Sequence, residues 1–438
     1  MARTNISGEE RVGVWGLGVS GSSIIRYLVS RGQGVVALEK NSVPNRPFFD
    51  QHAIRIFRDP EEREDFFATC DRIVPSPGID LRPYPDVRHK IVAEIDLFQN
   101  AWRRPIIGIT GTLGKTSITH LLSNLLTIGG KRVATGGNIG IGMLDLVASQ
   151  EGHDLAVLEL SSFQLVDGIL RTQQPAEGLA LLPLALAPHL RTDGHCAGRR
   201  LAWFSMTRPG KTELKNIECA KDTIYLATAA GFVRIGPEGE RLFFTCESIP
   251  TISFTQNWLI LAAACDLLGY DAEKLITDAS PVLALPHNRL EFVANIDGVD
   301  YLNDSKSTIM PATIAAVRSR SAQPTVLLLG GLSKGVDRLP YMSELSAITH
   351  AVCFGGEAEA LGAACLQAQI PATCCADLEG ALEAARRIAT PGSCILLSPG
   401  GASFDLFRNY EERGAHFVRL VRRCEITQRS YGREPGPG

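Results

Sequence analysis

A glycine-rich turn, Gly108-Ile-Thr-Gly-Thr-Leu-Gly-Lys-Thr-Ser117, constrains the fold of this chain more than any other segment. An apolar strand precedes the turn and a helix pattern follows it. Such a strand–loop–helix unit points backbone N–H groups at one spot, where a lysine meets phosphate oxygens and a hydroxyl meets Mg²⁺. The turn therefore predicts an α/β sheet that binds a nucleoside triphosphate. Ile109 replaces the first glycine of the standard motif, and the alternative interpretation is a glycine turn with a solvated lysine.

Size and composition narrow the class of protein. At 438 residues the chain is too long for one ordinary core, so two or three domains are expected. The formal net charge of -3 lacks the basic excess of a nucleic-acid binder, and the 11 cysteines include no CxxC pair. We find no apolar signal segment and no run of the ~18 residues that a membrane helix needs. The chain is expected to be cytoplasmic, with no nucleic-acid partner and no membrane insertion.

The first block combines a second glycine motif with a βαβ pattern. Gly16-Leu-Gly-Val-Ser-Gly21 fits G-x-G-x-x-G between an apolar strand and a helix expected at 22–31, and Glu39 ends the next strand. Taken alone, this pattern is typical of a dinucleotide-binding oxidoreductase. Because a second nucleotide loop follows, a nucleoside diphosphate such as a UDP-sugar is the favoured ligand.

Alternating strands and helices predict an α/β architecture for most of the remaining chain. We expect strands at 72–76, 106–110, 131–134, 155–160, 178–182, 325–329 and 394–397. We expect helices at 257–268 and 311–318, and a hairpin at 290–302 that turns at Asp297-Gly298. Between Gly194 and the helix at 257 the pattern predicts no definite elements.

Polar loops follow several of these strands. Glu159 ends an apolar strand downstream of the phosphate loop, where a carboxylate suits Mg²⁺, although such a residue is often an ordinary surface glutamate. Three loops in the last block, 303–308, 330–337 and 398–405, present lysines, hydroxyls or glycines. Lysines on such loops neutralise phosphates or carboxylates, so the three loops predict a common pocket.

Seven ordered motifs give nearly the whole chain a resemblance to the Mur ligases. They are Gly-Ile-Thr-Gly-Thr-x-Gly-Lys-Thr (108–116), Gly-Asn-Ile-Gly (137–140), Glu-Leu-Ser-Ser-Phe-Gln-Leu (159–165), Leu-Pro-His-Asn-Arg-Leu-Glu (285–291), Asn-Asp-Ser-Lys (303–306), Gly-Gly-Leu-Ser-Lys-Gly-Val-Asp (330–337) and Ala-Ser-Phe-Asp-Leu-Phe-Arg-Asn-Tyr-Glu-Glu-Arg-Gly (402–414). The third and the last motif are characteristic of the branch that adds D-glutamate.

The resemblance implies an α/β fold of three domains. These are an N-terminal Rossmann-like domain that binds the UDP-sugar (1–103), a central P-loop ATPase-like domain that binds ATP (104–289) and a C-terminal Rossmann-like domain that binds glutamate (290–438). The implied reaction belongs to peptidoglycan precursor synthesis: with Mg²⁺, ATP phosphorylates the carboxylate of UDP-MurNAc-L-alanine, and the amino group of glutamate attacks the acyl phosphate. The family is typically monomeric.

The resemblance also implies roles for individual residues. The implied catalytic residues are Lys115, Glu159, His189 and Lys306. The implied ATP-binding residues are Gly111, Thr112, Gly114, Lys115, Thr116, Ser117, Asn257, Arg289 and Asp304, and the implied Mg²⁺ ligands are Thr116, Glu159 and His189. The implied substrate contacts are Val19, Ser20, Ser76 and Gly78 for the UDP part, Asn138 for the muramoyl part, and Thr308, Lys334, Ser403 and Tyr410 for glutamate.

The chain also departs from the family pattern. Leu113 replaces an asparagine of the phosphate loop, and Asn288 is inserted within Leu-Pro-His-Arg. In the segment 182–210, Trp203 or Phe204 stands where the family has a lysine that is carbamylated to bridge Mg²⁺, and Lys211 is the nearest lysine. Either the metal site is remodelled, or this segment is altered and the chain is a non-catalytic protein that binds UDP-sugar or ATP. Motifs do not distinguish D- from L-glutamate, so an L-glutamate-adding variant stays open.

Overall fold

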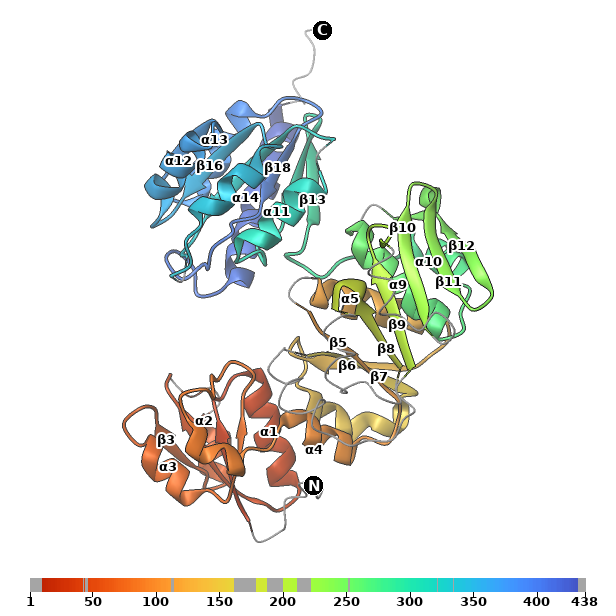
Figure 1. The fold of residues 1–438 in the computed structure, drawn as a ribbon. Coiled ribbons are helices and arrows are strands. Elements are labelled where there is room, and N and C mark those ends of the chain that lie inside the picture. Colours follow the sequence, from red (N-terminus) through yellow and green to blue (C-terminus); the bar gives the residue numbers. More distant parts are fainter. Residues whose placement is uncertain are drawn as a thin grey trace. The chain divides into compact units, whose positions relative to one another are not determined.

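The computed structural model describes residues 10–41, 43, 46–111, 114–160, 179–186, 200–210, 222–250, 253–320, 322–333 and 335–431. The chain forms two compact units (Figure 1). The first comprises Met1–Pro250 and Thr255–Leu283, and the second comprises Thr251–Phe254 and Ala284–Gly438.

The first unit begins with a four-stranded parallel sheet in the order β3-β2-β1-β4. Its elements are β1 (Arg11–Trp15), α1 (Val19–Ser30), β2 (Gly34–Glu39), α2 (Arg46–Gln51), β3 (Arg55–Arg58), α3 (Arg63–Thr69) and β4 (Arg72–Pro75). The expected strands β1, β2 and β4 are confirmed, because each is an apolar run buried on both faces. The short edge strand β3, with an arginine at each end, was not predicted.

Helix α1 corrects a predicted boundary. It begins at Val19, three residues before the expected start at Ser22. A Cβ at Gly21 would lie 1.8 Å from the carbonyl oxygen of Gly16, so this glycine lets the first helical turn pack directly on the loop.

A three-stranded parallel sheet, β5-β7-β6, follows in the same unit. Its strands are β5 (Ile106–Ile109), β6 (Val133–Gly137) and β7 (Leu155–Glu159), and its helical segments are α4 (Glu94–Ala101), α5 (Lys115–Ile128) and η2 (Met143–Gly152). Strand β6 starts two residues later than expected and continues to Gly137. Helix α1 packs on η2, where Arg26 forms an ion pair with Asp145 at 2.6 Å, and one apolar core continues through both sheets.

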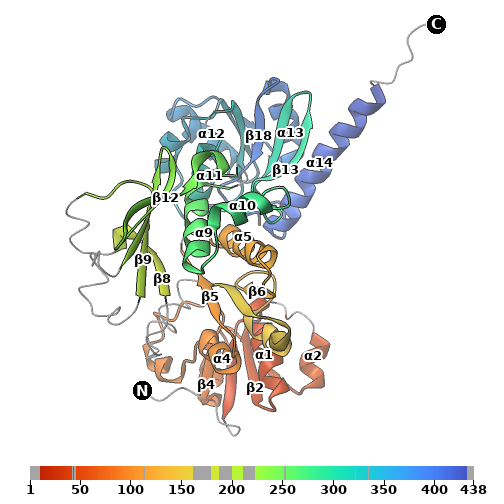
Figure 2. The ribbon, with the colours of Figure 1, turned by 90° about the vertical axis from the view of Figure 1, so that its right-hand side faces the viewer.

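The strand expected at 178–182 is confirmed, and it joins the segment with no definite prediction in a five-stranded sheet, β12-β11-β10-β9-β8 (Figure 2). Its strands are β8 (Leu179–Pro183), β9 (Arg200–Ser205), β10 (Thr223–Thr228), β11 (Gly231–Gly236) and β12 (Gly239–Thr245), followed by α9 (Thr255–Leu267) and α10 (Ala272–Ala279). Trp203 of β9 is fully buried and donates its indole N–H to Asp222 at 3.0 Å. The aromatic residue at the expected lysine position is therefore a core residue.

The second unit contains a six-stranded sheet in the order β13-β14-β18-β15-β16-β17. Its elements are β13 (Glu291–Ile296), β14 (Val299–Asn303), α11 (Met310–Arg318), β15 (Thr325–Gly330), β16 (His350–Phe354), α12 (Ala358–Gln367), β17 (Ala372–Cys375), α13 (Leu378–Ile388), β18 (Cys394–Leu397) and α14 (Tyr410–Tyr431). Helices α11 and α12 cover one face, and α13 and α14 cover the other.

Only the β13–β14 pair of this sheet is antiparallel, and the predicted hairpin is confirmed. Asp297 and Gly298 at its turn have φ values of 54° and 75°, as a tight two-residue hairpin turn requires. Because β14, β18 and β15 are parallel neighbours, the loops after them meet at one edge of the sheet.

Candidate active site

The phosphate loop joins β5 to the N-terminus of α5. Gly114 precedes the helix with a φ of 81°, a left-handed conformation that favours glycine. A Cβ at this position would lie 2.7 Å from the Oδ1 atom of Asn257, which is buried on α9. Since glycine has no side chain to cap the helix, the first N–H groups of α5 are left for an anion.

The polar side chains of this loop gather around the same helix end. Lys115 donates its ammonium to the carbonyl oxygen of Gly111 at 2.6 Å. Thr116 and Ser117 are buried in the first turn of α5. The structure thus brings these predicted nucleotide-binding residues together with Asn257, whereas Thr112 lies outside the described residues.

Glu159 ends the central strand of this sheet, beside the start of the phosphate loop. In the parallel register it pairs with Ile109 on one side and Gly137 on the other. Its side chain is only 4% exposed, and its Oε2 atom has no hydrogen-bond partner among the described residues. Asn138, the next predicted residue, is exposed and donates its backbone N–H to the carbonyl oxygen of Glu159 at 2.9 Å.

The donor set around Glu159 fits Mg²⁺. A buried carboxylate oxygen without a partner carries a desolvation cost that a cation relieves. Mg²⁺ is commonly held by one or two carboxylates, water and substrate phosphates, and Thr116 provides a hydroxyl in the first turn of α5, directly after the phosphate loop. Within the described residues no group of three His, Cys, Asp or Glu side chains gathers as a metal site. His189 and Lys211 lie outside the described residues.

The N-terminal glycine loop lies at the switch point of its sheet, where the chain leaves β1 towards β2 and β4 pairs on the other side. Ser76, after β4, donates its hydroxyl to the carbonyl oxygen of Gly16 at 2.8 Å. Val19 is 58% exposed at the start of α1, and Ser20 is buried beside it. The predicted UDP contacts in the loops after β1 and β4, Val19, Ser20, Ser76 and Gly78, therefore meet at one edge of this sheet.

Glu39 has a structural role in this loop. Its Oε2 atom accepts the N–H of Leu17 at 2.6 Å, and its Oε1 atom accepts the N–H groups of Lys40 and Asn41 at 2.8 Å each. Both carboxylate oxygens are thus bound to the backbone. A dinucleotide-binding protein uses the acid at this position for the ribose hydroxyls, so the arrangement disfavours a nicotinamide site.

In the second unit, a buried arginine connects two of the predicted loops. Arg413 on α14 is fully buried and donates to the hydroxyl and carbonyl oxygens of Ser305 at 2.9 and 2.8 Å, and to the carbonyl oxygen of Gly401 at 3.1 Å. Burial lowers the pKa of Arg413 to about 10, so the guanidinium remains charged at neutral pH. Sequence reasoning gave this residue no role, although it stands inside the last motif.

Asp304 is the buried centre of the loop after β14. It accepts hydrogen bonds from the hydroxyls of Ser307 at 2.5 Å and Ser398 at 2.8 Å, and its Oδ1 atom lies 3.7 Å from the Nη1 atom of Arg289. Burial raises the pKa of Asp304, while the charge of Arg289 opposes that rise. The carboxylate thus orients Arg289, and a nucleotide contact for either residue remains a prediction.

The predicted glutamate residues lie around the same loops. The ammonium of Lys306 lies 5.7 Å from the ring centroid of Tyr410, within cation–π range. The hydroxyl of Ser305 donates to the carbonyl oxygen of Tyr410 at 2.8 Å, which holds the start of α14 against the Lys306 loop. Ser403 is buried in the loop after β18, and Thr308 is half-buried. Lys334 lies outside the described residues.

Comparison with known proteins decides the family. The profile of the Mur ligase middle domain matches residues 109–180. The chain is 33% identical to the UDP-N-acetylmuramoylalanine–D-glutamate ligase of Marinobacter nauticus, in an alignment that covers 95% of this chain and 99% of that protein. The chain belongs to the Mur ligase family. The protein of the same name from Chromohalobacter salexigens is also 33% identical, over 92% of this chain and 95% of that protein.

Solved structures support the fold of this Mur ligase. The UDP-N-acetylmuramate–alanine ligase of Thermotoga maritima matches 96% of this chain and 100% of its own, with a TM-score of 0.54 and 14% identity. MurF from Acinetobacter baumannii matches 89% and 91%, with a TM-score of 0.54 and 16% identity. At these identities the likeness concerns the fold alone. No helix among the described residues has the length and hydropathy of a membrane span.

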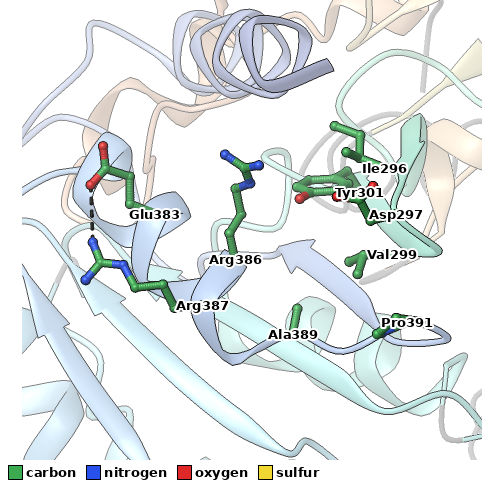
Figure 3. A pocket seen from close by; sticks show the side chains of 9 residues that line it. All are labelled: Ile296, Asp297, Val299, Tyr301, Glu383, Arg386, Arg387, Ala389 and Pro391. Carbon is green, nitrogen blue, oxygen red and sulfur yellow. Dashed lines mark hydrogen bonds and ion pairs between the residues drawn. The ribbon is translucent and has the colours of Figure 1, made fainter. Parts of the chain in front are cut away.

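A pocket of about 470 Å³ in the second unit lies apart from the predicted site residues of this Mur ligase (Figure 3). Its lining residues are Ile296, Asp297, Val299, Tyr301, Glu383, Arg386, Arg387, Ala389 and Pro391. They lie at the hairpin turn, on β14, on α13 and just before β18, whereas the predicted loops follow β14 and β18. The pocket is therefore at the opposite edge of the sheet.

Proposed function

We propose that this Mur ligase adds D-glutamate to UDP-N-acetylmuramoyl-L-alanine, with ATP and an acyl-phosphate intermediate, in peptidoglycan precursor synthesis. The observation that carries the proposal is the full-length similarity, at 33% identity, to proteins that bear the name of this activity. The phosphate loop and the buried, unpartnered Oε2 atom of Glu159 agree with an ATP-dependent reaction.

We propose three functional domains, at residues 1–103, 104–289 and 290–438, for the UDP-sugar, ATP and glutamate. The parallel sheets and their loops support this division, since β1–β4, β5–β7 and β13–β18 each belong to a separate sheet. The protein is proposed to act as a cytoplasmic monomer.

At the phosphate loop, the N–H groups at the start of α5 and the ammonium of Lys115 would bind the β- and γ-phosphates. Thr116, Glu159 and His189 would hold Mg²⁺, which when bound neutralises phosphate charge. Because a carboxylate is a poor electrophile, its phosphorylation provides a leaving group before an amine attacks. Asn138, whose backbone N–H donates to the carbonyl oxygen of Glu159, would contact the muramoyl part.

In the second unit, the cation of Lys306 would bind a carboxylate of glutamate beside Tyr410. Thr308, Lys334 and Ser403 would complete that site. Arg413 supports the proposal, because it holds the loops after β14 and β18 in one arrangement and so reduces the ordering that substrate binding requires. In the first unit, Val19, Ser20, Ser76 and Gly78 would bind the uridine diphosphate.

A second candidate function is a non-catalytic protein that binds UDP-sugar or ATP. The observation that favours it is the burial of Trp203 and Phe204 in β9, where the family pattern has a lysine. An L-glutamate-adding ligase is a further variant of the first proposal.

Release of ADP tests these proposals directly. The purified chain is given ATP, Mg²⁺ and UDP-MurNAc-L-alanine, with D-glutamate, L-glutamate or neither, and the product is identified by mass. A parallel reaction omits UDP-MurNAc-L-alanine. The main proposal requires ADP release and a new amide with D-glutamate only. Equal ADP release without the acceptor would refute the assignment, and ATP binding without turnover would favour the non-catalytic candidate. Lys115→Ala is the control for phosphate-loop chemistry.

A further inference from the structure

Asn288 lies in an uncommon backbone conformation just before β13. Its φ is 64°, and Leu290, two residues later, has a φ of 45°. Asparagine is one of the few residues with a side chain that accept this left-handed region at low cost. Although Asn288 interrupts the Leu-Pro-His-Arg pattern, it is buried, whereas the side chain of the preceding His287 is 91% exposed. The extra residue is thus packed into the unit rather than displaced into solvent.

The hydrogen bonds of Asn288 reach two positions of the loop that carries Lys306. Its carbonyl oxygen accepts the backbone N–H of Lys306 at 3.0 Å. Its Oδ1 atom accepts a hydrogen bond from the Nδ2 atom of Asn303 at 3.0 Å, and its own N–H donates to Glu291 at 2.9 Å. Asn288 therefore binds both the last residue of β14 and the backbone of the lysine.

Helix α14 leaves little room for any movement of Asn288. A Cβ at Gly414 would lie 1.6 Å from the Oδ1 atom of Asn288, so the amide packs directly against the backbone of that helix. The same amide partner, Asn303, also donates to the Oε2 atom of Glu291 at 3.0 Å. Asn288 is consequently held from three directions by described residues of the second unit.

The neighbouring residues continue the same contact. Leu290 donates its N–H to the Oδ1 atom of Asp304 at 3.3 Å. Arg289, between Asn288 and Leu290 in the sequence, places its guanidinium 3.7 Å from the same atom of Asp304. The turn formed by residues 288–290 thus contacts the loop at Asn303, Asp304 and Lys306. A shift of the turn would move both Arg289 and Lys306.

We infer that Asn288 is a positioning residue that sets the Lys306 loop for glutamate. This inference rests on the proposed function, in which Lys306 binds a glutamate carboxylate. The ammonium of a lysine binds a substrate carboxylate well only when the backbone of that lysine is held in a fixed position. If the backbone moves, the ammonium no longer reaches the carboxylate, and the other contacts of the substrate do not replace the lost binding energy. The backbone carbonyl oxygen of Asn288 binds the N–H of Lys306, and the side-chain amide of Asn288 anchors this residue to Asn303.

Asn288→Gly separates the contribution of the side chain from that of the backbone, because glycine keeps the left-handed conformation and removes only the side-chain amide. We expect the KM for glutamate to rise about fivefold or more, the effect of one lost hydrogen bond, while the KM for UDP-MurNAc-L-alanine stays within about twofold. Asn303→Ala should show the same split, and the double variant should be no worse than Asn303→Ala alone.

Gln369 offers a matched control for backbone strain. It has a φ of 62°, it is exposed, and it lies between α12 and β17 in the same unit. Asn288→Gly and Gln369→Gly both place a glycine in a left-handed backbone position, but only the former should raise the KM for glutamate. An equal rise in both would mean that general destabilisation explains the effect, and would overturn the inference.

Hydrogen exchange of the Lys306 amide provides a readout that does not depend on activity. Faster exchange in Asn288→Gly than in the wild type, with Gln369→Gly unchanged, supports the positioning role. Unchanged exchange and unchanged KM for glutamate would refute it. If the wild type shows no glutamate-dependent ADP release, the proposed function fails, and the exchange comparison still decides whether Asn288 holds the loop.

Discussion

Replacement of Gly114 by alanine tests how closely the phosphate loop packs on α9. Two features of the structure contribute to the energetic cost of this replacement. The φ of 81° costs an L-residue about 1–2 kcal/mol. The new Cβ would lie 2.7 Å from the Oδ1 atom of Asn257, and such overpacking costs about 1–3 kcal/mol. We therefore expect the free energy of unfolding of Gly114→Ala to fall by about 2–5 kcal/mol.

Gly130 provides the matched control in the same unit. Its φ is 88°, and a Cβ there would meet no heavy atom within 4 Å. Gly130→Ala should therefore lose only the backbone part, about 1–2 kcal/mol. Urea denaturation of both variants measures the difference, and calorimetry measures the Kd for ATP, which should rise about tenfold or more in Gly114→Ala only.

The pair of variants can refute the reasoning. If Gly114→Ala and Gly130→Ala lose equal stability, the contact with Asn257 has no energetic consequence. If the double variant Gly114→Ala/Asn257→Ala is no more stable than Gly114→Ala, the clash is not with that amide. In either case the close packing of the loop on α9 would not explain why residue 114 is a glycine.

Three further predictions concern charged groups. Glu159→Ala should stabilise the metal-free protein by about 1–3 kcal/mol, because it removes a buried acceptor that has no partner among the described residues. It should also raise the Mg²⁺ concentration that gives half-maximal ADP release. Lower stability of the variant in thermal unfolding without metal would contradict this prediction. Arg413→Met should lower the free energy of unfolding by about 3–5 kcal/mol, because it leaves buried acceptors on two loops without their donor. The control Arg408→Met, at an exposed position, should change the free energy of unfolding by less than about 0.5 kcal/mol in the same urea titration. Burial raises the pKa of Asp304, so its contribution to stability is full below its ordinary pKa of ~3.9 and falls as pH rises through that value towards the folded pKa. Asp304→Asn should lack this decline, and parallel pH–stability curves for the two proteins would contradict the assignment.

Several strands that are buried on both faces were predictable from the sequence. Strand β18 coincides with the expected 394–397, because an apolar run that ends at a proline–glycine loop admits few other interpretations. The strands β9 to β12 were not predicted, since the local pattern of β12, Gly-Glu-Arg-Leu-Phe-Phe-Thr, does not alternate. Their pairing is decided by contacts between segments that the sequence pattern does not connect.

The candidate site was also predictable from the sequence only in part. The glycines and the lysine of the phosphate loop were readable, because left-handed backbone and phosphate contact restrict the residue types at each position. The roles of Glu39, Asn288 and Arg413 were not readable. Each depends on a partner that is distant in the sequence or buried by another element, such as Ser305 for Arg413.

The sequence by itself determined the class of fold, the family and the phosphate loop, because these depend on local backbone preferences and on ordered motifs. Only the tertiary structure decided that Glu159 has a buried oxygen without a partner and that Trp203 is a core residue. It also decided that Asn288 contacts the Lys306 loop. The physical reason is that burial and hydrogen-bond partnership are properties of the packed neighbours, and these are set by the pairing of strands and helices rather than by the residue alone.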